Sequence, residues 1–222
     1  MLTHPQDRLA QLRQEVLPFD ARLVAVSKHR SIADIQQLYD HRQRNFGENR
    51  VQELLEKKPQ LPDDIQWHFI GRLQTNKVKQ LVPHVHLIHS LDRVKLIKEV
   101  AKQAAAHDTV VDGLIQFHIA EEDTKAGFTL AEATAYLDEG SWRDYTHLRL
   151  CGVMGMATFT DDQEQVRREF ATLKSTFDHL KARYFSRDDY FREVSMGMSG
   201  DYGIALREGS TIVRVGSYLF NN

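Results

Sequence analysis

The sequence predicts an α/β protein folded as one closed (β/α)8 barrel of the TIM type. Three observations support this fold: helix-like and strand-like segments alternate along the whole chain, the strand-like segments are short apolar runs, and eight of them can be counted. Helical crossovers require parallel pairing, and a strand that is covered on both faces reads as a continuous apolar run. An open doubly wound sheet is the alternative that the same alternation allows.

The first expected element is a helix at about residues 5–17, where apolar residues recur at helical spacing until Pro18 ends the pattern. The apolar run Leu-Val-Ala-Val then predicts the first strand at residues 22–27. The other strands are expected at residues 45–47, 66–71, 85–89, 111–119, 148–154, 193–196 and 211–215. The helices between them are expected at residues 31–41, 51–57, 75–81, 92–106, 130–138, 162–183 and 201–208. No linker rich in Pro, Gly or Ser divides residues 1–222, so a single domain is expected.

The composition is that of an ordinary globular protein, with 41% hydrophobic and 27% charged residues in a chain of 222. Since 29 Lys and Arg residues face 31 Asp and Glu residues, the net charge is -2, and no overall field favours nucleic acid or an anionic membrane. No apolar stretch approaches the roughly 18 residues that span a bilayer. The single Cys151 excludes an internal disulfide, and the charged N-terminal segment is unlike a signal peptide. We therefore expect a cytoplasmic protein without nucleic-acid or membrane partners.

In a barrel of this kind the functional site lies at the C-terminal ends of the strands. Lys28 ends the first predicted strand, and burial at the rim of an apolar core is expected to lower the pKa of its amine. A neutral amine attacks carbonyl groups, so Lys28 is a candidate nucleophile. The alternative is a strand-end lysine that only reaches solvent.

The loops after the seventh and eighth strands are where such barrels often hold a phosphate group. Here they comprise residues 195–201 and 214–217. Two glycines in the first loop and Gly216 in the second permit close backbone approach and convergent amides, and the hydroxyls of Ser195 and Ser217 add neutral donors. Two glycine-rich turns beside a helix cap are the alternative.

A lysine opposite a phosphate cradle suggests a ligand that joins an aldehyde to a phosphate, and pyridoxal 5′-phosphate (PLP) is the common cofactor with that combination. Arg214 lies two residues before Gly216, on the same face of the strand, and can direct its charge at the ring. An arginine that donates to the pyridine nitrogen keeps this nitrogen unprotonated and weakens the ring as an electron sink. A structural ion pair is the alternative role for Arg214.

Six motifs occur in order along nearly the whole chain. They are Ala25-Val-Ser-Lys28, Phe46-Gly-Glu-Asn-Arg50 with Gln52-Glu53, Trp67-His-Phe-Ile-Gly-Arg-Leu-Gln-Thr-Asn-Lys77, Cys151-Gly-Val-Met-Gly-Met156, Ser195-Met-Gly-Met-Ser199 and Val213-Arg-Val-Gly-Ser217. Together they resemble the YggS/PROSC family, the pyridoxal phosphate homeostasis proteins.

The resemblance implies a barrel similar to the N-terminal domain of alanine racemase that carries PLP as an internal aldimine on Lys28. It implies that Arg214 is the partner of the ring nitrogen, and that Ser195, Gly216 and Ser217 contact the phosphate. The remaining cofactor-binding residues that it implies are Asn49, His68, Gly71 and Met154 around the pocket, with Met196 and Ser199 in the phosphate loop.

Two further clusters are expected to be structural. The run from His84 through His86 to His89 contains no Cys, Asp or Glu, so no metal site is expected there. Arg72 and Lys77 belong to a small basic cluster that is typical of a solvated helix face.

The function expected from the resemblance is that of a PLP carrier or regulator in vitamin B6 and amino-acid homeostasis, without turnover of its own. PLP-dependent apoenzymes are the candidate partners, and nothing in the sequence demands more than a monomer. A PLP-dependent racemase is the first alternative, but racemisation needs an acid/base on each face of the substrate. Alanine racemases supply the second one with the help of a further domain, for which this chain has no residues left. A barrel that binds a phosphorylated metabolite without covalent chemistry is the second alternative.

Overall fold

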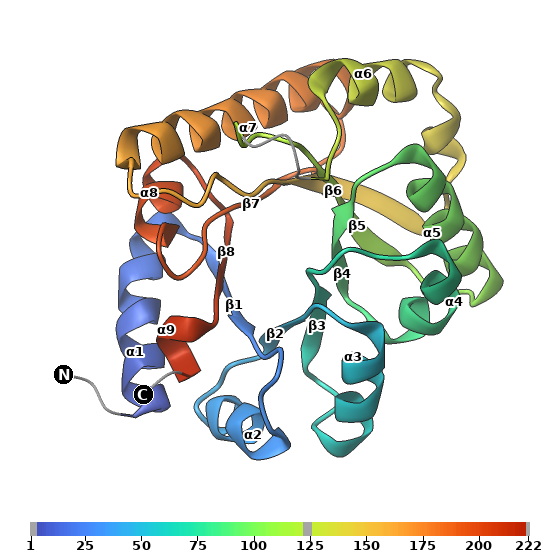
Figure 1. The fold of residues 1–222 in the computed structure, drawn as a ribbon. Coiled ribbons are helices and arrows are strands. Elements are labelled where there is room, and N and C mark those ends of the chain that lie inside the picture. Colours follow the sequence, from blue (N-terminus) through green and yellow to red (C-terminus); the bar gives the residue numbers. More distant parts are fainter. Residues whose placement is uncertain (1–3, 122–125, 221–222) are drawn as a thin grey trace.

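The protein forms one closed barrel of eight parallel strands, which follow each other in the order β1 to β8. The computed structural model describes residues 4–121 and 126–220. In the view along the barrel, the helices surround the strands as an outer ring (Figure 1). The predicted (β/α)8 barrel is thereby confirmed, and the open doubly wound sheet is excluded.

The bounds of the elements follow the predicted alternation. The strands are β1 (Arg22–Val26), β2 (Asn45–Glu48), β3 (Gln66–Phe69), β4 (Leu87–Leu91), β5 (Val111–Gln116), β6 (Leu148–Met154), β7 (Glu193–Ser195) and β8 (Ile212–Val215). The α-helices are α1 (Pro5–Val16), α2 (Ile32–Asp40), α3 (Val51–Lys57), α4 (Val78–Leu81), α5 (Val94–Ala106), α6 (Leu130–Asp138), α7 (Gln163–Tyr184), α8 (Tyr202–Arg207) and α9 (Ser217–Phe220).

Several elements differ from the prediction, and the strands β3 and β5 end two and three residues earlier than expected. The strand β4 begins and ends two residues later than expected, because the fully buried stretch is Leu87–Leu91. The helix predicted at residues 75–81 is divided into a 3-10 turn at Thr75–Lys77 and the short α4. The helix α9, directly after β8, was not predicted.

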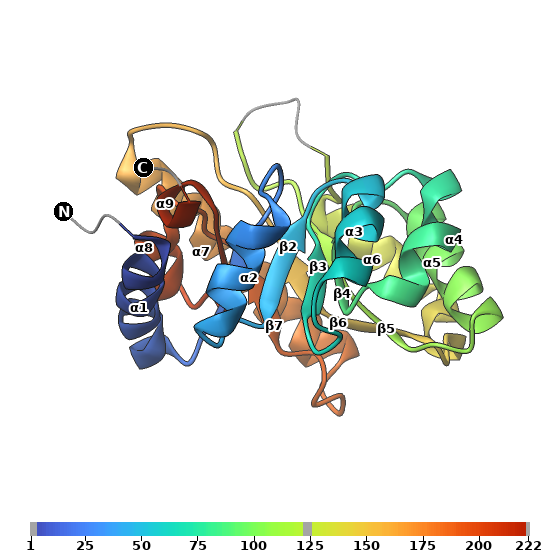
Figure 2. The same ribbon diagram turned by 90° about the horizontal axis from the view of Figure 1, so that it is seen from below.

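Two cores pack on the two faces of the barrel wall. The larger core lies between the strands and the helices, and a smaller one lies inside the barrel. The inner cluster consists of Val24, Leu87, Leu114, Cys151, Met154 and Ile212. Burial raises the pKa of the Cys151 thiol well above its ordinary value, so this cysteine is an inert interior group. Helices α1 and α9 lie side by side in both views and close the helical ring between β8 and α2 (Figures 1 and 2).

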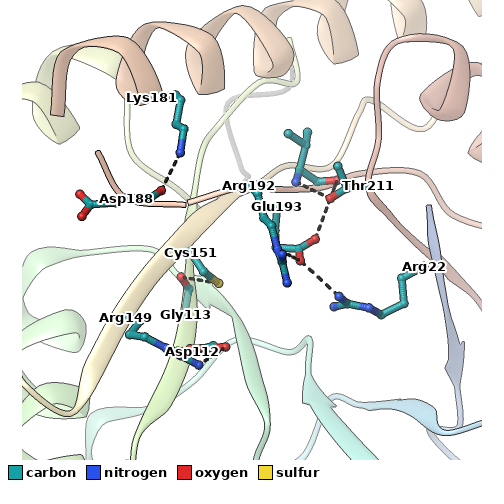
Figure 3. A network of polar contacts seen from close by, with 11 residues as sticks. Arg22, Asp112, Gly113, Arg149, Cys151, Lys181, Asp188, Arg192, Glu193 and Thr211 are labelled. Carbon is teal, nitrogen blue, oxygen red and sulfur yellow. Dashed lines mark hydrogen bonds and ion pairs between the residues drawn. The ribbon is translucent and has the colours of Figure 1, made fainter. Parts of the chain in front are cut away.

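The N-terminal end of the barrel is filled by charged side chains (Figure 3). Arg22 pairs with Glu193 at 3.2 Å, and Arg149 pairs with Asp112 at 2.6 Å. Thr211 donates a further hydrogen bond of 2.8 Å to Glu193. These groups lie at the starts of the strands, where residues of such barrels serve stability, so the site must be sought at the other end. None of the described helices is long and apolar enough to cross a membrane.

Candidate functional site

Lys28 lies at the C-terminal end of the barrel, two residues beyond the last residue of β1. It sits in a turn and its side chain is exposed. The expectation that Lys28 is buried at the rim of the apolar core is therefore wrong for this structure, because β1 ends at Val26 and the chain becomes exposed after the buried Ser27. The amine is accessible to a ligand at this end of the barrel.

A second lysine, Lys57, is buried directly beneath that turn. Its amine donates hydrogen bonds to the carbonyl of Ser27 at 2.8 Å, to Glu48 at 2.8 Å and to Glu53 at 2.7 Å. The hydroxyl of Ser27 also donates to Glu48, at 2.7 Å. Burial raises the pKa of Glu48, and one of its carboxylate oxygens has no hydrogen-bond partner among the described residues. We refer to Glu48, Glu53 and Lys57 as the lysine clamp.

The lysine clamp holds the backbone on both sides of Lys28. Lys57 binds the carbonyl of Ser27, and Glu53 accepts a hydrogen bond of 2.6 Å from the amide of His29. Burial alone would raise the pKa of Glu53, but the hydrogen bonds from Lys57 and His29 lower it. His29 has a positive φ of 60°. The turn that carries Lys28 is thus fixed at two points while its side chain stays free.

The loops after β7 and β8 meet at the hydroxyl of Ser199. This oxygen accepts hydrogen bonds from the amides of Gly216 and Tyr218, at 3.3 and 3.4 Å. Two amides that converge on one oxygen are the arrangement that binds an anion. Gly216 also passes close to β1, because a Cβ at this position would lie 3.0 Å from Cβ of Val26 and 3.1 Å from its carbonyl oxygen. Ser217, the first residue of α9, follows Gly216 directly.

Ser195 and Met196 differ from Ser199 in their surroundings. Both are completely buried. Ser195 lies inside the barrel, whereas Met196 packs in the larger core between strands and helices. Met196 therefore belongs to the wall behind the loop and not to the inner cluster.

A chain of polar side chains crosses the interior of the barrel. Asn45 bonds to Nε2 of His68 at 3.0 Å, and Nδ1 of His68 lies 2.8 Å from Nε2 of His89. Nδ1 of His89 lies 2.8 Å from the hydroxyl of Ser195, which accepts a hydrogen bond of 2.5 Å from Arg214. We call these five residues the barrel relay. Burial lowers the pKa of both imidazoles well below the ordinary value, so both are neutral.

Arg214 forms the end of the barrel relay nearest the phosphate loops. Its guanidinium is 4% exposed and donates a second hydrogen bond of 3.3 Å to the carbonyl of Gly155. Burial lowers the pKa of Arg214 to about 10, so the group stays charged at neutral pH. A guanidinium has five N–H groups, and these two bonds do not exhaust them. Neither of these two bonds joins Arg214 to a carboxylate, although the charge of Asp201 acts against the lowering of its pKa by burial.

The other expected pocket residues lie on neighbouring strands. The side-chain oxygen of Asn49, just after β2, is buried without a hydrogen-bond partner among the described residues. Gly71, after β3, lies so close that a Cβ would be 2.1 Å from the Asn49 carbonyl oxygen. Met154 ends β6 inside the barrel. A cavity of about 770 Å³ opens beside Asn49 and is bounded by the basic cluster, including Arg72 and Lys77.

The three histidines of the run from His84 to His89 lie apart from one another. His84 is in a 3-10 turn, the ring of His86 lies edge-on to His68, and His89 is inside the barrel. No group of three or more metal-binding side chains occurs within residues 4–121 and 126–220.

The lysine clamp and His89 were not predicted as parts of the site. Glu48 and Glu53 lie in a motif that carried the family resemblance, and the i, i+4 spacing of Glu53 and Lys57 is a helix-pair pattern that could have suggested their contact. His89 is 106 residues away from its partner Ser195, so only the closed barrel brings the two together.

Comparisons with known proteins agree with this architecture. The family model for the alanine racemase N-terminal domain matches residues 2–221. The pyridoxal phosphate homeostasis protein of Aquifex aeolicus is 40% identical over 204 residues, covering 90% of this chain and 86% of the relative. That of Helicobacter pylori strain 26695 is 36% identical over 201 residues, with coverage of 90% and 86%. The structure of PipY from Synechococcus elongatus with PLP bound superposes with a TM-score of 0.90 at 33% identity, covering 98% of this chain and all of PipY. The chain therefore belongs to the alanine racemase N-terminal domain family and, within it, to the pyridoxal phosphate homeostasis proteins.

Proposed function

We propose that this protein binds PLP as a covalent imine at Lys28 and acts in PLP and amino-acid homeostasis without catalytic turnover of its own. One observation carries the proposal: an exposed lysine, two convergent amides and a buried arginine lie at the same end of one barrel. The PLP-bound structure of the relative PipY supports the same ligand.

The residues at this end fit each part of PLP. A phosphate oxygen takes the place at which the amides of Gly216 and Tyr218 now meet the Ser199 hydroxyl, and Ser217 adds a further donor. The unpartnered oxygen of Asn49 offers an acceptor beside the ring. The proposed pocket is completed by His68, Gly71, Met154 and Ser195, with Met196 in the wall behind the phosphate loop.

When bound, PLP supplies an aldehyde carbon for the amine and a ring that withdraws electrons. Lys28 would hold the ligand through an imine at this carbon, with the aldehyde oxygen released as water. Arg214 donates an N–H to the ring nitrogen, which consequently stays unprotonated. The ring is then a weak electron sink, and this argues against a racemase and for a protein that holds and hands over PLP.

The location and partners belong to the same proposal. We infer a cytoplasmic monomer, folded as one domain over residues 1–222, that supplies PLP-dependent apoenzymes. The names of the relatives, which describe homeostasis and not an enzymatic reaction, support the role in PLP homeostasis.

The covalent attachment is tested by borohydride reduction of the PLP-loaded protein and peptide mass mapping. We expect the adduct on Lys28 alone, and Lys57 is the internal control, since three acceptors occupy its amine. The Lys28→Ala variant is expected to lose the visible absorbance of the imine and to retain PLP weakly through its phosphate. An adduct on Lys57, or none, contradicts the assignment, and absence of PLP binding favours the phosphorylated-metabolite alternative.

The absence of turnover is tested with the PLP-loaded protein and a panel of L- and D-amino acids. Racemisation, transamination and decarboxylation are followed, and the protein is mixed in parallel with a PLP-free apoenzyme. We expect apoenzyme activation and no amino-acid turnover. A rate of roughly 1–1000 per second, as in ordinary enzymes, on any amino acid would establish the racemase-type alternative instead.

A further inference from the structure

We propose that the barrel relay is a one-directional hydrogen-bond chain that positions Arg214. Each of its five members is a side chain from a different strand: β2, β3, β4, β7 and β8. The inference rests on the proposed function only where PLP binding is used as a readout.

The direction of the chain follows from the chemistry of its ends. Arg214 can only donate, so the hydroxyl oxygen of Ser195 must accept. The proton of this hydroxyl then needs an acceptor, and Nδ1 of His89 lies 2.8 Å away. Nε2 of His89 consequently carries the proton of this ring and donates it to Nδ1 of His68. Nε2 of His68 finally donates to the side-chain oxygen of Asn45.

The opposite direction leaves a group unsatisfied. If Nδ1 of His89 donated to Ser195, the serine oxygen would accept from both His89 and Arg214. The proton of the Ser195 hydroxyl would then have to find an acceptor in a completely buried site. A buried donor without a partner is destabilising, because it loses its hydrogen bond to water and gains none in return. The direction that starts at Arg214 satisfies every member.

The chain acts on Arg214 through its fixed orientation. One end of the guanidinium is held by Ser195 and the other by the Gly155 carbonyl, so the planar group cannot rotate without breaking a buried bond. Ser195 is in turn held by His89. His68, His89 and Asn45 are therefore positioning residues, which make no contact with the ring nitrogen but fix the donor that does.

Two substitutions of His89 distinguish a role in positioning Arg214 from a role in stability alone. His89→Asn keeps an acceptor near the place of Nδ1 and loses the contact with His68, whereas His89→Gln keeps a donor near Nε2 and loses the contact with Ser195. Each breaks one bond of the same chain, so a purely structural role predicts equal behaviour. The positioning role predicts that only His89→Gln releases Arg214.

The first measurement uses the ligand-free protein and nitrogen-15 NMR. In the wild type, both imidazoles are expected as the Nε2–H tautomer, and the two terminal nitrogens of Arg214 are expected as separate, slowly exchanging signals. His89→Asn should keep these signals separate, and His89→Gln should average them. Nδ1–H tautomers in the wild type overturn the direction, and a freely rotating wild-type guanidinium or equal behaviour of the two variants overturns the positioning.

The second measurement is the dissociation constant for PLP. His89→Gln is expected to bind PLP about tenfold more weakly than His89→Asn, the equivalent of one net hydrogen bond. Equal affinities also overturn the positioning role. Should the wild type bind no PLP, the proposed function fails, while the tautomers and the Arg214 signals still decide on the relay. Thermal unfolding checks that both variants fold, and the wild-type tautomers alone remain decisive if they do not.

Discussion

The backbone at Gly216 meets two structural requirements, a hydrogen bond from its amide and a close approach to β1. Its amide points to the oxygen of Ser199, and its Cα approaches Val26 so closely that a Cβ would be in tight contact. Glycine is the residue that permits this approach, because any side chain must displace β1 or the loop. The proposed phosphate cradle therefore depends on the absence of a side chain as much as on the presence of donors.

We predict that Gly216→Val loses most of its affinity for PLP. The branched side chain meets Val26 and moves the amide that the phosphate needs; charge-assisted bonds of this kind contribute roughly 1.5–3 kcal/mol each. Titration of the apoprotein with PLP, followed by absorbance, measures the effect. Gly203→Val is the matched control, because a Cβ at Gly203 in α8 comes no closer than 3.8 Å, to the Arg207 side chain. Equal loss in both variants would show that the cradle lies elsewhere.

The contribution of the Gly216 amide to phosphate binding can also be tested by changing the ligand. Pyridoxal has the aldehyde but no phosphate, so it keeps the reaction with Lys28 and loses the amides of Gly216 and Tyr218. We expect pyridoxal to bind at least tenfold more weakly than PLP. Similar dissociation constants for the two aldehydes would remove the phosphate from the proposal.

The lysine clamp joins three elements: the turn after β1, the end of β2 and the helix α3. Its members include two carboxylates and one ammonium group, and Glu48 and Lys57 have side chains exposed by 0% and 9%. A charge that loses its partner in such a place remains desolvated, and breaking a buried pair in this way costs roughly 3–5 kcal/mol. The clamp thus couples the folding of α3 to the position of Lys28.

We predict that Lys57→Met lowers the free energy of unfolding by roughly 3 kcal/mol and loosens the Lys28 turn. Urea denaturation measures the first effect, and faster hydrogen exchange of the His29 amide measures the second. Lys79→Met, on an exposed position, is the control and should change neither. Glu48→Gln added to Lys57→Met should recover part of the stability, since it removes the unpaired charge. An unchanged His29 amide in Lys57→Met would exclude the clamping role.

The bounds of the helices and strands show where sequence patterns suffice to predict an element. The helix α6 and the strand β6 begin and end as predicted, and α6 starts at a capping box in which Thr129 and Glu132 bond each other's backbone amides. The strand β4 was placed two residues too early, because Val85 and His86 continue the apolar run but lie before the ladder. The spacing of residues in the sequence predicts periodicity and helix caps. It does not predict which residue of one strand pairs with which residue of the next.

The candidate site divides along the same line. The places of Gly216 and Arg214 in the fold were predictable, because loop position and strand alternation fix their faces. The partners of Arg214 were not, because Ser195 and His89 meet only when the eight strands close in one particular register. The exposure of Lys28 was also missed, since the strand ends at Val26 and not at the lysine.

For the molecule as a whole, buried neutral histidines make stability depend on pH. In the folded state the pKa values of His68 and His89 are well below 6.5, whereas the unfolded chain takes up protons near that pH. The stability that these two histidines contribute is fully present above their pKa in the unfolded chain. It is lost as the pH falls from there toward their lower pKa in the folded protein. His84 and His86, whose pKa values burial also lowers, act in the same direction.

We predict that the free energy of unfolding falls by about 2 kcal/mol between pH 7 and pH 5.5 from His68 and His89 together. Urea denaturation at the two pH values measures it. The raised pKa of Glu48 acts in the opposite direction, so a Glu48→Gln background isolates the histidines. His89→Asn in that background should make the drop smaller by about 1 kcal/mol, which is half of the share of His68 and His89. A drop that is the same with and without His89 would mean that this ring is not held neutral.

The ion pairs at the starts of the strands determine at which end of the barrel a ligand can enter and leave. Arg22 with Glu193 and Arg149 with Asp112 close the N-terminal end, and the inner cluster fills the space above them. The barrel is therefore open only at its C-terminal end, and a ligand that enters there must leave by the same opening. Under the proposed function, PLP would enter and leave through this one opening, so an apoenzyme that covered it would also exclude the next ligand.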